Sequence, residues 1–266
     1  MSNGRNSGGV PMIVWQVLLG AVMIGVWQAG ADTGVLDKFF FSRPSDIAKR
    51  VLQWLSTGSI WNHLVVTVTE AVLSFVIGVS LGVGLGFLLA RVDWLAKLLD
   101  PYIRIANALP RVVLAPLFLL WFGLGIWSKV ALGVTVVFFV VFFNTFQGVR
   151  EVDQVLLNNA RMLGASERQL VRHVLIPSAL AWIFSSLHIS VGFAIIAVVV
   201  GEYLGASSGV GYLIAQAEGV FDTTGVFAGM TVLASVVLVV GEGVSRLERW
   251  LLRWKPGRET ETRGVV

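Results

Sequence analysis

The sequence contains no cysteine and very little charge. Without Cys the chain has no disulfide framework and no thiol chemistry. Asp, Glu, Lys and Arg together make up 14% of its 266 residues, whereas a soluble globular protein has about 25%. The hydrophobic share is 56% and the mean hydropathy is +0.79. Because the apolar residues gather in runs of about 20, the length that crosses a bilayer, the composition indicates an integral membrane protein.

The motifs of several enzyme and binding classes are also missing. None of the five Lys follows a Gly, so the phosphate-cradling G-K-[ST] loop is absent. The three His (His63, His173 and His188) lack metal-ligand spacing, and no G-x-S-x-G nucleophile elbow occurs. Nucleic-acid binding needs a basic surface on a folded module, which the pattern does not provide. We therefore expect no enzyme activity, catalytic residue, metal or cofactor on this chain, and no nucleic-acid partner.

Six apolar segments predict an all-α integral membrane fold with six transmembrane helices. The segments cover about residues 11–30, 62–90, 101–123, 127–147, 178–204 and 224–246. The first could be a signal peptide, but only Arg5 precedes it and no clean small-residue cleavage site follows, which favours a true span. The expected organisation is a cytoplasmic tail at 1–10, a transmembrane domain at 11–250 and a cytoplasmic tail at 251–266.

Lys and Arg favour the cytoplasmic side of a membrane. With a cytoplasmic N-terminus, 14 of the 20 Lys and Arg fall inside, 5 fall outside, and Arg111 lies in a span. Both termini and the segment 148–177 are therefore expected in the cytoplasm. The segment 31–61 is expected outside, where RPSDIAKRVLQWL reads as an amphipathic helix on the membrane surface or on the outer face of the bundle.

Two spans carry unusual residues. In segment 62–90 every fourth residue is small, which lets a neighbouring helix approach closely; the stripe is Ser74, Gly78, Gly82, Gly86 and Ala90. It predicts packing within the subunit, with a subunit interface or a pathway lining as the alternatives. Segment 101–123 contains Pro101, Pro110 and Pro116, which predict either a broken, pathway-adjacent element or a simple kink.

Polar side chains within membrane segments face the protein interior or water, because exposure to lipid is costly. The candidates for lining a pathway are Glu70, Asn107, Arg111, His188 and Glu202. Glu70 and Glu202 could instead lie near the outer interface, and Arg111 could extend its stem to either interface.

The stretch NNARMLGASERQLVRHVLIP, residues 158–177, interrupts the apolar pattern. We expect two short helices at an angle. Leu156, Ala160 and Leu163 form the apolar face of the first helix, and Gly164 ends it. Ser166 and Gln169 match a capping box that starts the second, which Pro177 closes. The pair is either a docking element or an amphipathic loop on the membrane.

The order of residues in this stretch resembles the EAA loop of ABC importer permeases, E-A-A-x-x-x-G-x9-I-x-L-P. Ala160, Gly164 and Pro177 match it, Val174 and Ile176 are conservative replacements, and Asn158 and Asn159 stand at its Glu-Ala positions. Three further segments look like the nitrate/sulfonate/taurine branch and its pyrimidine-precursor and aromatic-compound relatives: RPSDI at 43–47, LPRVVLAPLFLLWFG at 109–123 and GEYLGASSGVGYLI at 201–214. The resemblance covers about residues 40–255.

The resemblance implies a type I ABC importer (MetI-like) permease fold in the bacterial inner membrane. It implies a second copy of the permease, two cytoplasmic ATPase subunits that bind ATP and Mg, and an extracytoplasmic substrate-binding protein. The coupling loop 148–177 would then contact the ATPase; the residues assigned to this contact are Asn158, Asn159, Ala160, Gly164, Ala165, Ser166, Val174, Ile176 and Pro177.

The substrate and the energy source are less sharply defined by the sequence. Glu70 and His188 stand where anion-importing relatives often have Arg, which favours an organic aromatic or heterocyclic nutrient over an inorganic anion. An ion-gradient-driven secondary transporter is the alternative function, and it would be expected to show inverted repeats and coupled membrane carboxylates.

Overall fold

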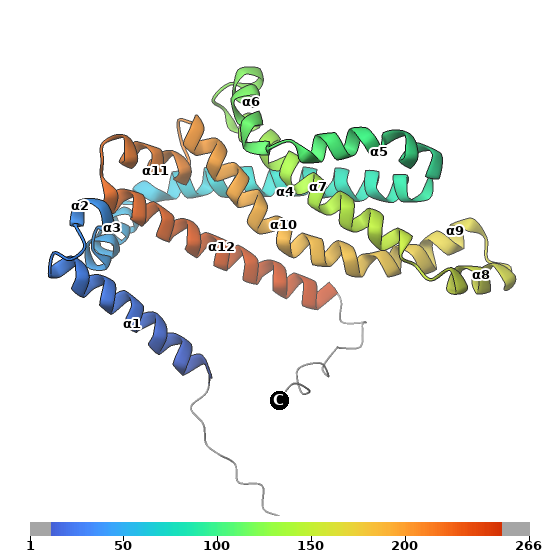
Figure 1. Ribbon diagram of the computed structural model, residues 1–266, viewed down its shortest axis with the longest axis horizontal. Helices are drawn as coiled ribbons and strands as arrows, with labels where there is room; N and C mark the ends of the chain where they lie inside the picture. The colour runs from blue at the N-terminus through green and yellow to red at the C-terminus, as the bar shows by residue number, and fades with distance from the viewer. Residues whose placement is uncertain (1–11, 252–266) are drawn as a thin grey trace, which may run out of the picture.

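The computed structural model describes residues 12–251, and this part of the chain is helical throughout (Figure 1). The expected tail 1–10 and nearly all of the expected tail 251–266 lie outside the described residues. The elements are α1 (Met12–Asp32), α2 (Lys38–Phe41), α3 (Pro44–Thr57), α4 (Ser59–Arg91), α5 (Asp93–Ala108), η1 (Arg111–Leu114), α6 (Ala115–Phe122), α7 (Ile126–Arg150), α8 (Gln154–Met162), α9 (Glu167–Leu170), η2 (Val171–Leu175), α10 (Ile176–Leu204), α11 (Val210–Gly219) and α12 (Thr223–Leu251).

Among the described residues, five helices are long and apolar enough to cross a membrane, and a bent pair of helices makes a sixth if it counts as one span. The five lie at Met12–Asp32, Ser59–Arg91, Ile126–Arg150, Trp182–Leu204 and Thr223–Arg246. Each overlaps one of the apolar segments read from the sequence, so the prediction of an all-α membrane fold is confirmed.

The sixth expected span, 101–123, is not one straight helix. It is replaced by α5 and the η1–α6 segment, which meet at an angle of 87°. The chain is extended at Leu109, which precedes Pro110, because the proline ring disfavours helical geometry in the residue before it. Pro116 lies in the first turn of α6, where its missing N–H costs nothing. Pro101 lies inside α5 without ending it.

The centre of the bundle is the contact between α4 and α7, with α10 packed on α7. The small residues of α4 lie against α7. A Cβ added at Gly78 would lie 2.7 Å from Val137 Cβ, and one added at Gly82 would lie 2.9 Å from Phe138 O. The two backbones are therefore close enough that side chains are excluded from this line.

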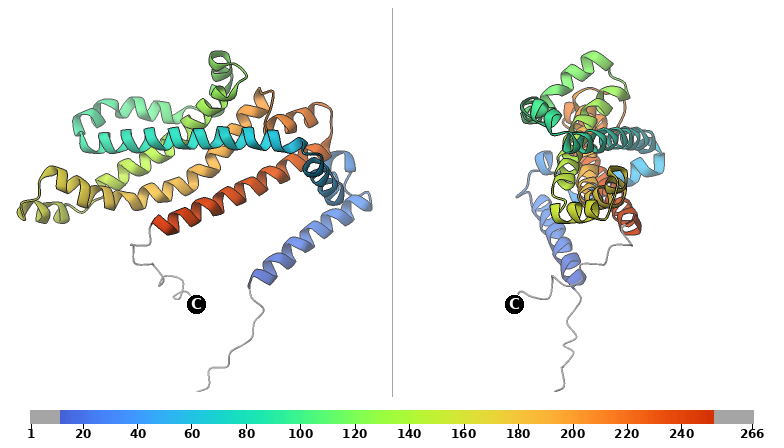
Figure 2. Two further views of the ribbon diagram at one scale, coloured as in Figure 1. Left: turned by 180° about the vertical axis from the view of Figure 1, so that it is seen from behind. Right: turned by 90° about the vertical axis from the view of Figure 1, so that its right-hand side faces the viewer.

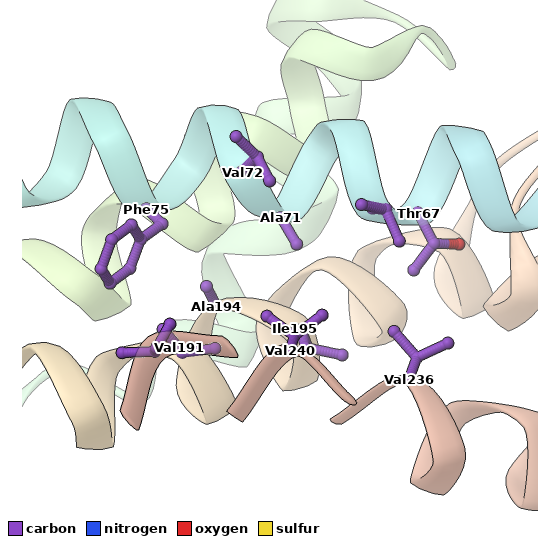
Figure 3. A pocket seen from close by; sticks show the side chains of 11 residues that line it. Thr67, Ala71, Val72, Phe75, Val191, Ala194, Ile195, Val236 and Val240 are labelled. Atoms are coloured by element: carbon purple, nitrogen blue, oxygen red, sulfur yellow. The ribbon is translucent and has the colours of Figure 1, made fainter. Parts of the chain in front are cut away.

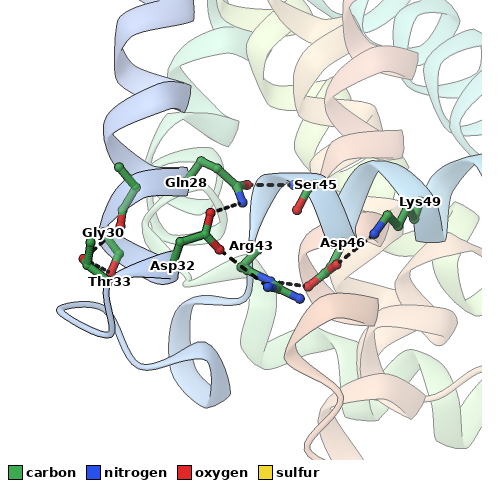
Figure 4. Close-up of polar contacts among 9 residues, drawn as sticks. Gln28, Gly30, Asp32, Thr33, Arg43, Ser45, Asp46 and Lys49 are labelled. Atoms are coloured by element: carbon green, nitrogen blue, oxygen red, sulfur yellow. Dashed lines mark hydrogen bonds and ion pairs between the residues drawn. The ribbon is translucent and has the colours of Figure 1, made fainter.

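The two ends of the bundle differ in structure. Helices α2, α3 and α11 gather at one end, and α8 and α9 form the opposite end, while α6 projects from the side (Figures 1 and 2). Helix α1 diverges from the bundle and buries only Ala31. Its last turn is held to α3 by polar contacts (Figure 4): Ser45 N donates to Gln28 Oε1 at 3.1 Å, and Arg43 pairs with Asp32 at 3.5 Å.

Candidate functional site

The end of the bundle formed by α8 and α9, here called the loop end, owes its local structure to capping and turn residues that are visible in the sequence. Asp153 accepts a hydrogen bond from Val155 N and starts α8. Gly164 turns the chain with φ +83°, a left-handed conformation that suits glycine. Ser166 and Gln169 then form the reciprocal capping box of α9. The angle between α8 and α9 is therefore fixed by one glycine and one cap.

A small apolar core attaches this turn to the bundle. Its buried members come from the end of α7 and from both sides of the turn: Val149, Val152, Leu157, Leu170, Leu175 and Ala179. On its surface, Arg91 at the end of α4 pairs with Glu167 at 2.9 Å, and Arg161 pairs with the same carboxylate at 3.4 Å. These two contacts hold the pKa of Glu167 below its ordinary value, mainly through the hydrogen bond from Arg91. Motion of α8 is therefore linked to α4 as well as to α10.

The face of α8 differs from the one expected. Leu157 is buried, whereas Leu156 and Leu163 are exposed, and Leu163 is 89% exposed at the tip beside Met162 at 81%. Asn158 and Asn159 are also exposed, and Ala160 is half-buried. A hollow of about 280 Å³ lies next to the turn, lined by Ala160, Leu163, Gly164, Ala165, Gln169, Leu170, His173 and Val174. The turn thus presents large apolar side chains that the subunit itself does not cover.

The expectation that Pro177 closes a separate second helix is wrong. α9, η2 and α10 follow one another without a gap, and the five residues Val171–Leu175 form a π-helical turn. Proline inside a helix removes one backbone donor and clashes with the carbonyl four residues earlier. A wider π-turn directly before Pro177 accommodates both effects and lets the helix continue. The element after Gly164 is therefore one long helix that reaches from the loop end to the opposite end.

At the opposite end, a buried polar cluster joins α4 to the segment after α10. Thr67 Oγ1 donates to Glu202 Oε1 at 2.7 Å, Gly211 N donates to Glu202 Oε2 at 2.8 Å, and Val210 N donates to Thr67 Oγ1 at 2.9 Å. Glu70 and Lys129 complete the cluster; both are buried and interact electrostatically with Glu202.

The charges of this cluster are enclosed by the subunit. Glu70, Glu202 and Lys129 are each exposed by no more than 2%. Lys129 Nζ donates to the carbonyl oxygens of Leu124 at 2.5 Å and Gly125 at 3.0 Å. Within residues 12–251, Glu70 Oε2 has no hydrogen-bond partner. Burial of charge is costly without compensating partners. The hydrogen bonds from Thr67 and Gly211 supply them for Glu202 and attach the α10–α11 connection to α4.

The remaining candidate residues lie in two other places. Arg111 Nη2 donates to Asn107 Oδ1 at 2.5 Å across the bend between α5 and η1, and the guanidinium lies 5.0 Å from the centre of the Phe139 ring. His188 lies apart, with Nδ1 at 3.3 Å from Ser245 Oγ on α12. The structure thus brings Asn107 and Arg111 together, and Glu70 and Glu202 together, but does not bring the two pairs and His188 into one site.

Three residues of these polar contacts are not among the candidates that the sequence indicates. Thr67 lies three residues before Glu70 on one helix, a spacing that could have signalled a shared face. Lys129 lies in the first turn of α7 and is buried, although its place near the start of an apolar segment suggests an exposed charge. Arg91 gives no local signal, since its partner Glu167 is distant along the chain.

An apolar cavity of about 120 Å³ lies between α4, α10 and α12 (Figure 3). Side chains from all three helices point into it, and all of them are apolar except Thr67; among them are Ala71, Phe75, Val191, Ile195 and Val236. With no charged residue in its lining, this cavity does not match a polar solute.

The bent span, the apolar helices and the exposed turn together indicate a helical membrane subunit with an interaction surface at one end. The family model of the binding-protein-dependent transport system inner membrane component matches residues 76–254. The chain belongs to this family and is an ABC transporter permease.

The relatives are permeases as well. A Bacillus subtilis permease named for aliphatic sulfonate transport is 35% identical over 91% of this chain and 88% of its own length. The riboflavin transport system permease of Chloroflexus aurantiacus is 34% identical over 88% of this chain and 87% of its own length. The inward-facing MetNI methionine ABC transporter has the same fold, with a TM-score of 0.58 at 22% identity over 74% of this chain and 95% of that one.

Proposed function

We propose that this chain is the transmembrane subunit of an ATP-driven importer, with both termini in the cytoplasm. Two copies would form the pathway, two cytoplasmic ATPase subunits would bind ATP and Mg, and an external binding protein would deliver a small organic nutrient or anion. The relatives named for aliphatic sulfonate and riboflavin transport support this class of cargo.

The observation that carries the proposal is the exposed apolar turn at residues 162–165. Leu163 and Met162 project from a turn whose angle is fixed by Gly164 and by the Ser166 cap. Apolar side chains of this size that the subunit leaves uncovered mark an interaction site. The turn leads into one continuous helix, formed by α9, η2 and α10, that ends at the buried Glu202 cluster. Because this helix runs from one end of the bundle to the other, it is suited to transmit movement of an ATPase into the bundle.

ATP binding would close the ATPases and displace the two turns. The bundles would then tilt between inward-open and outward-open states. Asn107 and Arg111, at the bend of the broken span, are our first candidates for contact with cargo on its way. Glu70, Glu202 and His188 remain candidate pathway residues, and a role for the two Glu would require α4 and the α10–α11 connection to separate.

The test is purification of tagged chain from its native membrane in mild detergent, with mass spectrometry of the proteins that accompany it. An ATPase in stoichiometric amount is expected with the wild type and is expected to be lost with Leu163→Asp. The matched control is Val35→Asp, since Val35 is 81% exposed at the opposite end of the bundle. A chain that purifies alone, and whose transport survives ATP depletion but stops when the ion gradient collapses, would replace this proposal with a secondary transporter.

A further inference from the structure

A larger hollow lies between α4, α5, α7 and α10 and differs in character from the apolar cavity. Its volume is about 550 Å³, within the range of roughly 300–1,000 Å³ that small-molecule sites occupy. Its lining combines aromatic rings with polar side chains; among the lining residues are Phe142, Phe143, Phe146, Trp182, Asp100, Arg104, Asn107, Asn144 and Gln147. We call it the α5–α7 pocket. Apolar walls with a few convergent polar groups are typical of ligand sites.

Two amide side chains of this pocket, Asn144 and Gln147, each use one N–H in a hydrogen bond within the subunit. Asn144 Nδ2 donates to Val140 O at 2.8 Å, and Gln147 Nε2 donates to Glu151 Oε1 at 2.6 Å. Their carbonyl oxygens are therefore oriented acceptors. The two residues are three apart on α7, so they lie on one face of that helix. A ligand with N–H donors along one edge would match this pair.

Aromatic rings run along the same part of α7. Phe139 stacks on Phe143 with ring centroids 6.3 Å apart, and Phe142 stacks on Phe146 at 6.0 Å. Phe143 is partly exposed and lines the pocket together with Asn144 and Gln147. Stacking on an aromatic side chain suits any planar ring, while hydrogen bonds to its edge select among rings.

The charged side chains of the pocket lining are paired with each other. Its two charged residues, Arg104 and Asp100, pair with each other at 2.8 Å. The nearby guanidinium of Arg111 is directed to Phe139 and Asn107. Transfer of an anion such as a sulfonate from water to a lining whose own charges are already paired would be unfavourable. The lining therefore matches a neutral molecule.

We propose that the α5–α7 pocket binds a neutral, planar heteroaromatic compound. The ring stacks on Phe143, and its N–H edge donates to Asn144 Oδ1 and Gln147 Oε1. This inference rests on the proposed function, in which the pocket is a binding site for the transported molecule within the permease. It narrows the class of transported molecule from a small organic nutrient or anion to a heteroaromatic compound.

The experiment is direct binding to the full chain, with the proteins that accompany it, in lipid nanodiscs. Cytosine, whose amino group carries two N–H donors, serves as the neutral heteroaromatic probe, and ethanesulfonate serves as the anionic probe. Cytosine should bind once per chain, and ethanesulfonate should neither bind nor compete. Asn144→Leu and Gln147→Leu should each weaken binding by about tenfold, the loss expected for a good amide–base contact. Gln216→Leu, which removes an exposed amide on α11, should leave the affinity unchanged.

Phe143→Leu supplies a second, independent variant, with Phe122→Leu as its matched control at an exposed position of α6. Binding of ethanesulfonate to the wild type, no binding of cytosine, or an unchanged affinity in all three pocket variants would overturn the proposal. The ATPase in the same preparation is scored separately. A chain that retains its ATPase but binds no ring is still a permease, so failure of the pocket and failure of the importer assignment are distinguishable.

Discussion

Thr67 and Glu202, 135 residues apart in the sequence, share a hydrogen bond of 2.7 Å that joins the N-terminal third of α4 to the end of α10. Thr67 Oγ1 also accepts from Val210 N at 2.9 Å. A single hydroxyl therefore connects two transmembrane helices and the first turn of α11. Because α10 begins at the opposite end beside the exposed turn, this contact lies at the far end of the helix that the turn would move.

Replacing Thr67 with Val should destabilise the subunit by about 1–3 kcal/mol, because Val210 N and one oxygen of Glu202 are left buried without this partner. Val has nearly the same shape, so the loss reports on the hydroxyl. The measurement is thermal unfolding of the purified chain in detergent. Thr69→Val, an exposed neighbour on the same helix, is the control, and equal unfolding temperatures for the two variants would contradict the role of the cluster.

The turn at Gly164 should tolerate Asn but not Val. Its φ of +83° is accessible to Asn and strained for a β-branched residue. No side chain lies within 4 Å of an added Cβ, so the cost comes from the backbone alone. Gly164→Val should therefore reorient the exposed turn and separate ATP hydrolysis from transport, while Gly164→Asn should retain both. Transport and ATPase rates of the reconstituted complex are the readout, and normal transport in the Val variant would remove the coupling assignment.

Features that depend on neighbours in sequence were predictable. Apolar runs located the spans, and Gly164 with the Ser166–Gln169 pair located the turn, because local chemistry decides both. Features that depend on packing were not. The burial of Lys129 requires the contact between α7 and α10, and the π-turn before Pro177 requires a helix stabilised on both sides by its neighbours. The α5–α7 pocket combines residues from four helices, and no spacing within one segment signals it.

Gly82 and Gly84, two residues apart on α4, should differ in how well they tolerate substitution by Leu. A Cβ at Gly82 would lie 2.9 Å from both Phe138 O and Val141 Cβ, whereas at Gly84 nothing lies within 4 Å. Gly82→Leu should therefore separate α4 from α7 and destabilise the subunit by at least about 1–3 kcal/mol. Gly84→Leu should be tolerated. Yield of folded protein and unfolding temperature test the pair, and similar values would show that the close contact is dispensable.

The pair between Arg50 of α3 and Asp222 before α12, 2.5 Å apart, predicts a pH dependence of stability. Burial raises the pKa of Asp222, but the hydrogen bond from Gly225 N and the Arg50 guanidinium outweigh it and leave the pKa below its ordinary value of 3.8. The folded state therefore binds this proton less readily than the unfolded state. The stabilising contribution of this pair is complete at pH values above the ordinary pKa of Asp222. It is lost as the pH falls through the lower pKa that Asp222 has in the folded state.

Asp222→Asn should accordingly lower the unfolding temperature at neutral pH and flatten its decrease below about pH 4, the region in which an Asp titrates. Asp100→Asn is the control, since Asp100 is a more exposed Asp in an ion pair of α5. Parallel pH profiles for wild type and Asp222→Asn would show that the pair does not stabilise the α3–α12 contact.

Replacing Glu167 should weaken the coupling of ATP hydrolysis to transport without lowering the stability of the subunit. The Glu167 carboxylate lies between Arg91 of α4 and Arg161 of α8 and is largely exposed. Exposed ion pairs contribute little to folding, so Glu167→Gln should leave the unfolding temperature almost unchanged. The same change frees α8 from α4, and the amount of substrate moved per ATP should fall. Glu218→Gln, whose carboxylate contacts Tyr203 at the opposite end, should not reduce this ratio. If both variants transport like the wild type, movement of the turn reaches the bundle through α10 alone, and the Arg91 contact only orients the loop.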